Sequence, residues 1–288
     1  MKKLSALLLA LCFGIATARA EKLRISSFST VLTEIAQQVG GEKVSVTGHV
    51  KPGVDPHDFD PNAADLKAVS ATELILLSAK HVEGYVVKLR EASGDRASVL
   101  EVGDKLPALE VRGRAGAEDP HWWHSIGNIE RATRIVRDEL SRLRPEEKSA
   151  FKAGAAAYLG KIDKLKDWVE AKVAELPRDR RKLVTNHDSF GYFARDFGFT
   201  VYPIAGISNS DQPGTRKVAE IIATIRAEGV KAVFSETSEN RKVLEQITRE
   251  TGVRIGENLL ADGLGAAPLD TVEAMFRHNV TAIVEALK

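Results

Sequence analysis

The tripeptide Asp-Pro-His occurs twice in this sequence, at Asp55–His57 and at Asp119–His121. The first copy lies in a loop that holds three prolines and Gly53, and prolines restrict both their own φ and the residue before them, so the loop is stiff enough to aim a side chain. The second copy is followed by two tryptophans, whose rings provide a water-poor shell of the kind that strengthens a metal site. These positions predict metal binding or catalysis, although His57 could also be a solvated turn residue and His121 a structural one.

Two further side chains of metal-ligand type follow predicted strands in the second half of the chain. His187 comes directly after an apolar strand, and Asp262 follows the last predicted strand. In open α/β sheets, ligands bind beyond the carboxyl ends of the strands. We therefore expect His57, His121, His187 and Asp262 to meet in a cleft between two lobes, where three imidazoles and one carboxylate form a tetrahedral set suited to zinc.

The other histidines and several glutamates receive different predictions. Glu236 also follows a strand and is the alternative fourth ligand. His124 is expected on the surface and His81 at the start of a helix, partly exposed, with a supporting or ligand role left open for both. Two histidines receive no metal role and three glutamates are expected to be solvated: His49 and His278, and Glu42, Glu73 and Glu83.

Short runs rich in Val, Ile and Leu alternate with amphipathic stretches of helical length, which is the pattern of βαβ units. The predicted fold class is α/β, with two similar lobes, each a four-stranded, mostly parallel sheet with flanking helices, joined by one long rigid helix. The predicted strands are Leu23–Phe28, Val44–Val50, Glu73–Ser78 and Ser98–Val102 in the first lobe, and Lys182–Asn186, Phe199–Ile204, Ala232–Ser235 and Val253–Asn258 in the second.

The joining helix is predicted over Pro145–Leu176, because apolar residues recur there at steps of three and four and Pro177 stops the pattern. At 1.5 Å per residue it would be about 48 Å long, enough to span two lobes. A coiled coil is the alternative, but the repeat is short and its seam is thin. A docked terminal helix is expected over Leu269–Leu287. The predicted organisation is a signal peptide at 1–20, a first metal-binding lobe at 21–144, the linking helix at 145–177 and a second lobe at 178–288.

The N-terminus has the three regions of a secretory signal: a basic pair, the apolar run Leu4–Ile15, and the small-x-small sequence Ala18–Ala20. The run is too short for a bilayer span, which takes roughly 20 residues. Cys12 could mark a lipoprotein, but Leu11 stands where a small residue is wanted. The sequence therefore predicts soluble export to the periplasm, no membrane anchor, and a mature chain without disulfides or thiolate ligands.

Composition and charge exclude several classes of protein. With 43% hydrophobic and 28% charged residues the chain is typical of globular proteins. The formal net charge is only +1, so nothing in the overall charge predicts a nucleic-acid partner.

Seven segments combine in one order along the chain: the Asp55–His57 loop with the helix Asn62–Ser70, then Asp119–Trp123, the long helix, His187–Gly198, Gly206–Ser208, Phe234–Glu236 and Leu259–Asp262. Together they resemble the periplasmic metal-binding proteins of zinc and manganese ABC importers, over essentially the whole mature chain. The resemblance implies a two-lobed binding protein with metal ligands at His57, His121, His187 and Asp262 and no enzymatic reaction. It also implies an ABC permease as partner, with a metallochaperone as a further candidate, and a monomeric state.

The predicted function is capture of Zn²⁺ in the cleft between the lobes and its delivery to the permease, with the metal as transported ligand. Imidazole at position 187 favours zinc, because manganese prefers oxygen ligands. A manganese or iron protein of the same transport class is the first alternative. A zinc-dependent hydrolase is the alternative from another class, but it would need an open coordination position and a nearby general base. A binding protein for a chelated metal or small organic ligand would need an apolar or basic pocket instead.

Overall fold

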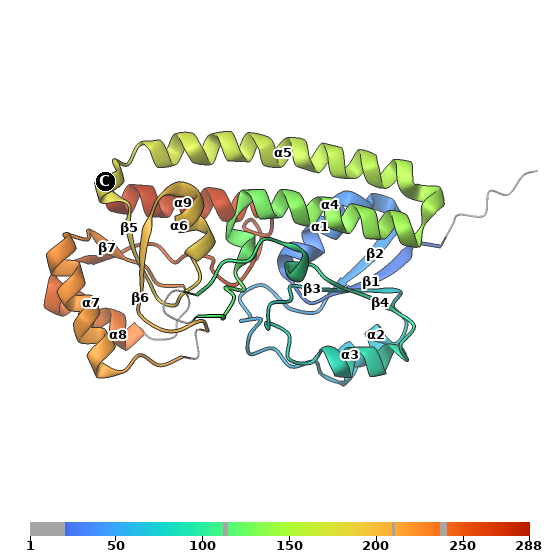
Figure 1. The fold of residues 1–288 in the computed structure, drawn as a ribbon, viewed down its shortest axis with the longest axis horizontal. Coiled ribbons are helices and arrows are strands. Elements are labelled where there is room, and N and C mark those ends of the chain that lie inside the picture. Colours follow the sequence, from blue (N-terminus) through green and yellow to red (C-terminus); the bar gives the residue numbers. More distant parts are fainter. Residues whose placement is uncertain (1–20, 112–114, 209–210, 237–240) are drawn as a thin grey trace, which may run out of the picture.

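The computed structural model describes residues 21–111, 115–208, 211–236 and 241–288, and the predicted signal peptide lies outside them. It contains two four-stranded sheets with the strand orders β2-β1-β3-β4 and β6-β5-β7-β8, and the paired strands are parallel throughout. Figure 1 shows the two lobes side by side beneath one long helix. The predicted fold class is confirmed. The strands are β1 (Leu23–Ser27), β2 (Val44–Gly48), β3 (Leu74–Leu77), β4 (Ser98–Glu101), β5 (Lys182–Thr185), β6 (Thr200–Pro203), β7 (Ala232–Val233) and β8 (Arg254–Ile255).

The first sheet is buried on both faces, as the apolar sequence of β3 requires. Leu74 and Leu76 pack in the core shared with α1 and α4, whereas Ile75 and Leu77 pack on the side of α2 and α3. This alternation follows from the two-residue period of a strand. Figure 1 shows the two pairs of helices on opposite sides of the sheet. The helices are α1 (Thr30–Gly40), α2 (Ala63–Val69), α3 (Val86–Ser93) and α4 (Ile126–Leu143).

The second lobe repeats this layering with shorter strands. Leu183 of β5 faces the core that contains α6 and α9, and Val184 faces α7 and α8. Strands β7 and β8 have two residues each, fewer than predicted, because beyond them the chain turns toward the centre of the molecule. The helices are α6 (Gly191–Phe197), α7 (Thr215–Glu228), α8 (Arg241–Thr251) and α9 (Val272–Leu287).

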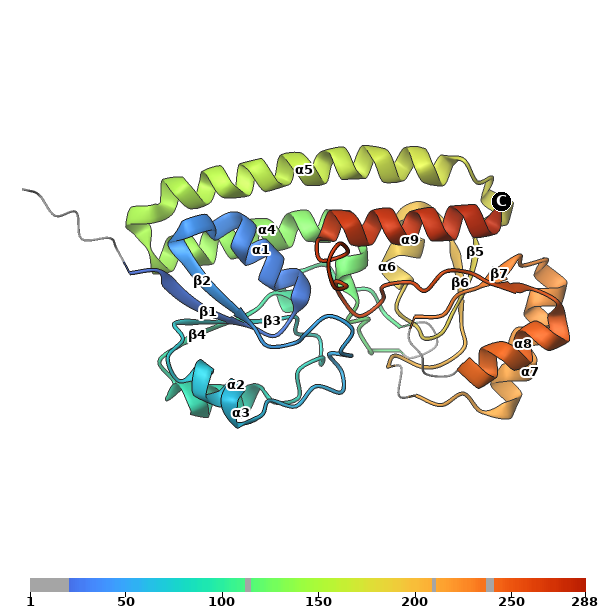
Figure 2. The ribbon, with the colours of Figure 1, turned by 180° about the vertical axis from the view of Figure 1, so that it is seen from behind.

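The linking helix α5 runs from Lys148 to Ala174 and is 27 residues long, about 40 Å. Pro145–Glu147 forms a separate 3-10 turn, so the helix begins later than predicted. Helices α1 and α4 of the first lobe and α9 of the second pack against it, as Figure 2 shows from behind. Helices α5 and α1 lie so close together at Gly154 that a Cβ there would be 2.4 Å from the carbonyl oxygen of Val39, so only glycine fits. Among the described residues, no helix is long and apolar enough to cross a membrane.

The segment after β3 corrects two predictions. Ala79, Lys80 and His81 have φ values of 66°, 53° and 68°, so His81 lies in a left-handed turn, and helix α3 begins only at Val86. The Glu83 carboxylate accepts the N–H groups of Ser78 (2.6 Å) and Ala79 (2.8 Å). Glu83 was predicted to be solvated but is 6% exposed, because its carboxylate holds this turn from inside.

Glu73 was also predicted to be solvated, and this prediction is wrong. It is partly buried and paired with Arg144 at 2.5 Å, because it stands where β3 begins, beside the end of α4. Glu42 is exposed, as expected.

Candidate metal centre

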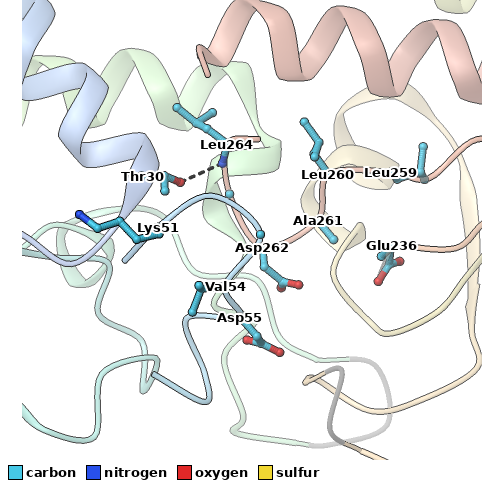
Figure 3. Close-up of a pocket in the computed structure, with 12 residues that line it drawn as sticks. Thr30, Lys51, Val54, Asp55, Glu236, Leu259, Leu260, Ala261, Asp262 and Leu264 are labelled. Atoms are coloured by element: carbon cyan, nitrogen blue, oxygen red, sulfur yellow. Dashed lines mark hydrogen bonds between the residues drawn. The ribbon is translucent and has the colours of Figure 1, made fainter. Parts of the chain in front are cut away.

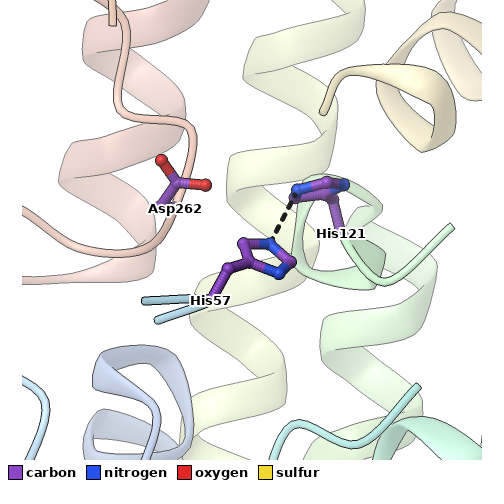
Figure 4. A group of neighbouring side chains, drawn as sticks. All are labelled: His57, His121 and Asp262. Atoms are coloured by element: carbon purple, nitrogen blue, oxygen red, sulfur yellow. Dashed lines mark hydrogen bonds between the residues drawn. The ribbon is translucent and has the colours of Figure 1, made fainter. Parts of the chain in front are cut away.

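His57 is aimed by the loop that follows β2. The Asp55 carboxylate accepts the N–H of His57 at 2.8 Å and closes a tight turn around Pro56. The imidazole points into the molecule, and its Nε2 lies 3.3 Å from Nε2 of His121 (Figure 4). Two imidazole nitrogens at this distance have the separation of ligands that share one metal ion.

His121 is fully buried and is held by Asp119 through two hydrogen bonds. The Asp119 Oδ1 atom accepts the backbone N–H of His121 at 2.9 Å and lies 2.8 Å from Nδ1 of its ring. Nδ1 therefore donates to the carboxylate, which leaves the lone pair of Nε2 for a metal. The two Asp-Pro-His copies thus share one local structure, in which the Asp fixes the His two residues later.

His187 follows β5, and a carboxylate faces each of its ring nitrogens. Nδ1 pairs with the buried Glu236, and Nε2 lies 3.2 Å from Oδ1 of Asp262. Glu236 also accepts the N–H of Asn186 at 3.2 Å. The structure therefore places Glu236 behind His187, as the group that orients its ring, and leaves Asp262 on the side of the other imidazoles.

Three of the four residues singled out in the sequence form one group between the lobes, and His187 adjoins that group through Asp262 and His121. Ligand atoms of His57, His121 and Asp262 all lie within 4.8 Å of one another. The ring centroids of His121 and His187 are 5.2 Å apart. Figure 4 shows the Asp262 carboxylate facing the two imidazoles of the first lobe.

The segment that carries Asp262 is anchored on the first lobe. Its Ala261 carbonyl accepts hydrogen bonds from Trp123 Nε1 (2.8 Å) and His124 Nε2 (2.7 Å). Beyond it, the N–H of Leu264 donates to Thr30 Oγ1 at 2.8 Å, as Figure 3 shows. Asp262 thus reaches the centre from the second half of the sequence but is held by side chains of the first lobe.

A cavity of about 50 Å³ lies beside Asp262, and Lys51, Asp55 and Glu236 are among the residues that line it (Figure 3). By this measure one water molecule needs about 10–15 Å³, whereas pockets for small organic ligands are usually about 300 Å³ or larger. This cavity is therefore too small for an organic ligand. Of the four predicted ligands only Asp262 lines it, so it adjoins the group of imidazoles on one side.

Burial and neighbouring charges set the protonation of the centre. Burial lowers the pKa of His121 well below its ordinary value, and His187 and His57 add to this. Burial also opposes charge on His187, but the carboxylates of Glu236 and Asp262 outweigh it and raise the pKa of His187 well above the ordinary value. Burial opposes ionisation of Asp262 too, yet His187 lowers its pKa to about 2. A dication binds ionised carboxylates and neutral imidazoles, so Asp262 and His121 have the binding forms and His187 must first lose its proton.

His124 is the main correction at the centre. It was expected on the surface but is 1% exposed, because its ring stacks on Phe190 and its Nε2 bonds the Ala261 carbonyl. Burial lowers the pKa of His124 to about 4. His124 directly follows two tryptophans, both of them buried, and this was the one sequence signal of its burial.

The histidines without a predicted metal role also lie apart from the centre. His49 lies between Asp65 (2.8 Å) and Ser26 (3.1 Å), and His278 of α9 bonds the carbonyl of Asn258 at 2.7 Å. Asp119 was not singled out from the sequence, although the repeated Asp-Pro-His could have indicated it.

The chain is similar in sequence to known metal-binding proteins over most of its length. A family model described as the periplasmic component A of the zinc-uptake complex, ZnuA, matches residues 26–286. The manganese-binding lipoprotein MntA of Bacillus subtilis is 31% identical over 277 residues, covering 93% of this chain and 90% of MntA. The iron-binding protein YfeA of Yersinia pestis is 28% identical over 269 residues, covering 92% of this chain and 86% of YfeA.

Among solved structures, the periplasmic zinc-binding protein TroA of Treponema pallidum superposes with a TM-score of 0.86 at 28% identity, covering 93% of this chain and 99% of TroA. The expected resemblance to metal-binding proteins of this kind is confirmed, as is the prediction that the chain is not an enzyme.

Proposed function

We propose, because the chain belongs to the ZnuA family of periplasmic zinc-uptake components, that it captures Zn²⁺ between its lobes and delivers it to an ABC permease. The proposed ligands are His57, His121, His187 and Asp262. Metal capture itself follows from the family, whereas the choice of zinc and the four ligands are the parts that need testing.

One observation supports the choice of zinc: ligand atoms of His57, His121 and Asp262 lie within 4.8 Å of one another, and Nε2 of His187 lies 3.2 Å from Asp262, so three imidazoles and one carboxylate are available. Zinc takes four nitrogen, sulfur or oxygen ligands in a closed tetrahedron, while manganese prefers more oxygens and a higher coordination number. Glu236 supports His187 from behind, so His187 brings a nitrogen to the centre. MntA and YfeA are named for manganese and iron, which makes a manganese or iron cargo the competing proposal.

The proposal includes export to the periplasm through a cleaved signal peptide at 1–20, action as a monomer, and a metallochaperone as a second candidate partner. The lobe boundaries 21–144, 145–177 and 178–288 are part of it, supported by the two separate sheets. Mass spectrometry of the exported chain tests the cleavage site, and a lipid on Cys12 would replace the soluble form with an anchored one.

Metal competition tests the cargo. Chelator-stripped protein is dialysed anaerobically against equal zinc, manganese and ferrous iron, and the bound metals are counted by mass spectrometry. We expect about one zinc per chain and little of the other two metals. Preferential binding of manganese or iron would overturn the choice of zinc, and binding of none would overturn the proposed function.

Two variants sharpen this experiment. His187→Asp should shift the preference toward manganese, because it replaces a nitrogen ligand by oxygen. His278→Ala removes an imidazole that lies outside the centre and should leave the preference unchanged.

A further inference from the structure

His124 contacts the segments that carry two of the proposed ligands. Its Nε2 atom lies 2.7 Å from the carbonyl oxygen of Ala261, the residue before Asp262. Its ring stacks on Phe190, three residues after His187, with centroids 4.5 Å apart and planes at 26°. The buried His124 side chain therefore links the segment that carries Asp262 to the segment that carries His187.

The hydrogen bond fixes the peptide that sets the direction of Asp262. A carbonyl acceptor requires that Nε2 of His124 carry the proton, so this nitrogen is a donor and is not available to a metal. Trp122–His124 forms a short 3-10 turn, and Trp123 Nε1 from the same turn donates to the same oxygen at 2.8 Å. With both donors on one oxygen, the Ala261–Asp262 peptide has little freedom to rotate.

The stacking contact in turn fixes the imidazole of His124. Phe190 is 1% exposed, and its ring also meets that of Phe193 edge to face at 6.1 Å. Because Phe190 is itself fixed by packing, the imidazole ring of His124 that stacks on it has a fixed orientation. That orientation determines the direction of Nε2. An aliphatic side chain in place of His124 could fill the space but could not donate, and a flexible amide could donate but could not stack.

We propose that His124 is a positioning residue for the metal centre, which holds the Asp262 carboxylate at the place where it meets His187. This role rests on the proposed function, since it matters only if Asp262 is a ligand. His124 acts through Asp262 and makes no bond to the metal.

A double-mutant cycle tests this role. Zinc affinity and release rate are measured by chelator competition and stopped flow for the parent, His124→Phe, Asp262→Ala and the double variant. His124→Phe keeps the stacked ring and loses the donor. We expect it to weaken zinc binding by about 10-fold, the lower end for residues that support a ligand, through faster release. In the Asp262→Ala background it should have no further effect on affinity.

Two more variants separate positioning from a general loss of structure. His124→Gln restores a donor and should recover part of the affinity. His278→Phe removes a comparable hydrogen bond, to the carbonyl of Asn258 in the same segment, and should bind zinc as the parent does. Bound cobalt provides an independent reading, because the visible spectrum reports the coordination number. The His124→Phe spectrum should move toward that of Asp262→Ala.

Three results would overturn the proposal: parental zinc affinity in His124→Phe, an equal loss from His124→Phe in both backgrounds, or a parental cobalt spectrum in that variant. Failure of the proposed function would look different, because the parent itself would then bind no zinc. An Asp262→Ala variant with parental affinity would reject Asp262 as a ligand, and with it the role of His124.

Discussion

Glu34 offers a test of the packing that holds the two lobes together. It lies on α1, is 7% exposed, and its Oε2 atom accepts the N–H of Val272 at the start of α9 at 2.7 Å. Burial raises the pKa of Glu34 to about 7 and Asp270 adds to this, while the Val272 hydrogen bond and Lys161 only partly oppose it. The substitution Glu34→Gln keeps the hydrogen-bond acceptor and removes the titrating carboxyl group.

The size of the effect follows from the two pKa values. On unfolding, the pKa of Glu34 returns from about 7 to its ordinary value of 4.5. At 1.36 kcal/mol per unit this difference is about 3 kcal/mol. Below pH 4.5 both states hold the proton and the full contribution to stability is present. As pH rises through 7 the unfolded chain has already lost its proton and the folded chain must lose it inside the core, so this contribution disappears.

Urea unfolding of chelator-treated protein at pH 5 and pH 8 measures this difference. The variant should be more stable than the parent at pH 8, by up to about 3 kcal/mol, and should differ much less at pH 5. Glu170→Gln, at an exposed position on α5, should show no such change between the two pH values. A Glu34→Gln difference that is the same at both pH values, or a variant less stable than the parent at pH 8, would show that Glu34 does not have a raised pKa in the folded protein.

Four further predictions concern the metal. Zinc at about 1,000 times its Kd should stabilise the fold by about 4 kcal/mol, because the unfolded chain cannot assemble the centre; an unchanged calorimetric melting curve would contradict this. Zinc affinity should fall as the pH decreases, by up to about tenfold per pH unit for one displaced proton, because Glu236 and Asp262 outweigh burial and raise the pKa of His187 well above its ordinary value; an affinity independent of pH would exclude such a proton. Asp262→Ala should still bind zinc, with faster release in stopped flow, whereas His121→Ala should cost more; equal losses would reject this ranking. Glu236→Gln should weaken zinc binding by about 10- to 100-fold in chelator competition, and parental affinity would show that orientation by Glu236 is unimportant.

The sequence predicted the strands well, because period and composition are local properties. All eight expected strands are present, and the largest error is at β8, predicted over Val253–Asn258 and observed as Arg254–Ile255. The pairing beyond β8 shows the cause: the N–H of Gly256 bonds the carbonyl of Val233 and the N–H of Leu259 bonds that of Ser235, so three residues on one segment match two on the other and the regular ladder ends. The turn at His81 was missed for a similar reason, since a buried carboxylate imposes its left-handed backbone.

The candidate site was predictable as far as its residues follow strands or stiff loops. His57, His187 and Asp262 stand beyond strands of parallel sheets, so topology alone places them near the centre. The burial of His124 depends on the carbonyl of Ala261, 137 residues away, and no local pattern contains that contact. The pairing of Glu236 with His187 is equally distant and required the structure.

The route of the chain from Ala261 to Val272 has a consequence for how long an ion stays bound. This segment leaves the second lobe, bonds Trp123, His124, Thr30 and Glu34 of the first through four hydrogen bonds, and returns as α9. It is thus a second connection between the lobes, in addition to the long helix α5. Breaking all four bonds costs about 4 kcal/mol, at about 1 kcal/mol for each hydrogen bond. Movement of Asp262 away from the imidazoles of the first lobe is opposed by this cost, which would slow the release of any ion that Asp262 helps to hold.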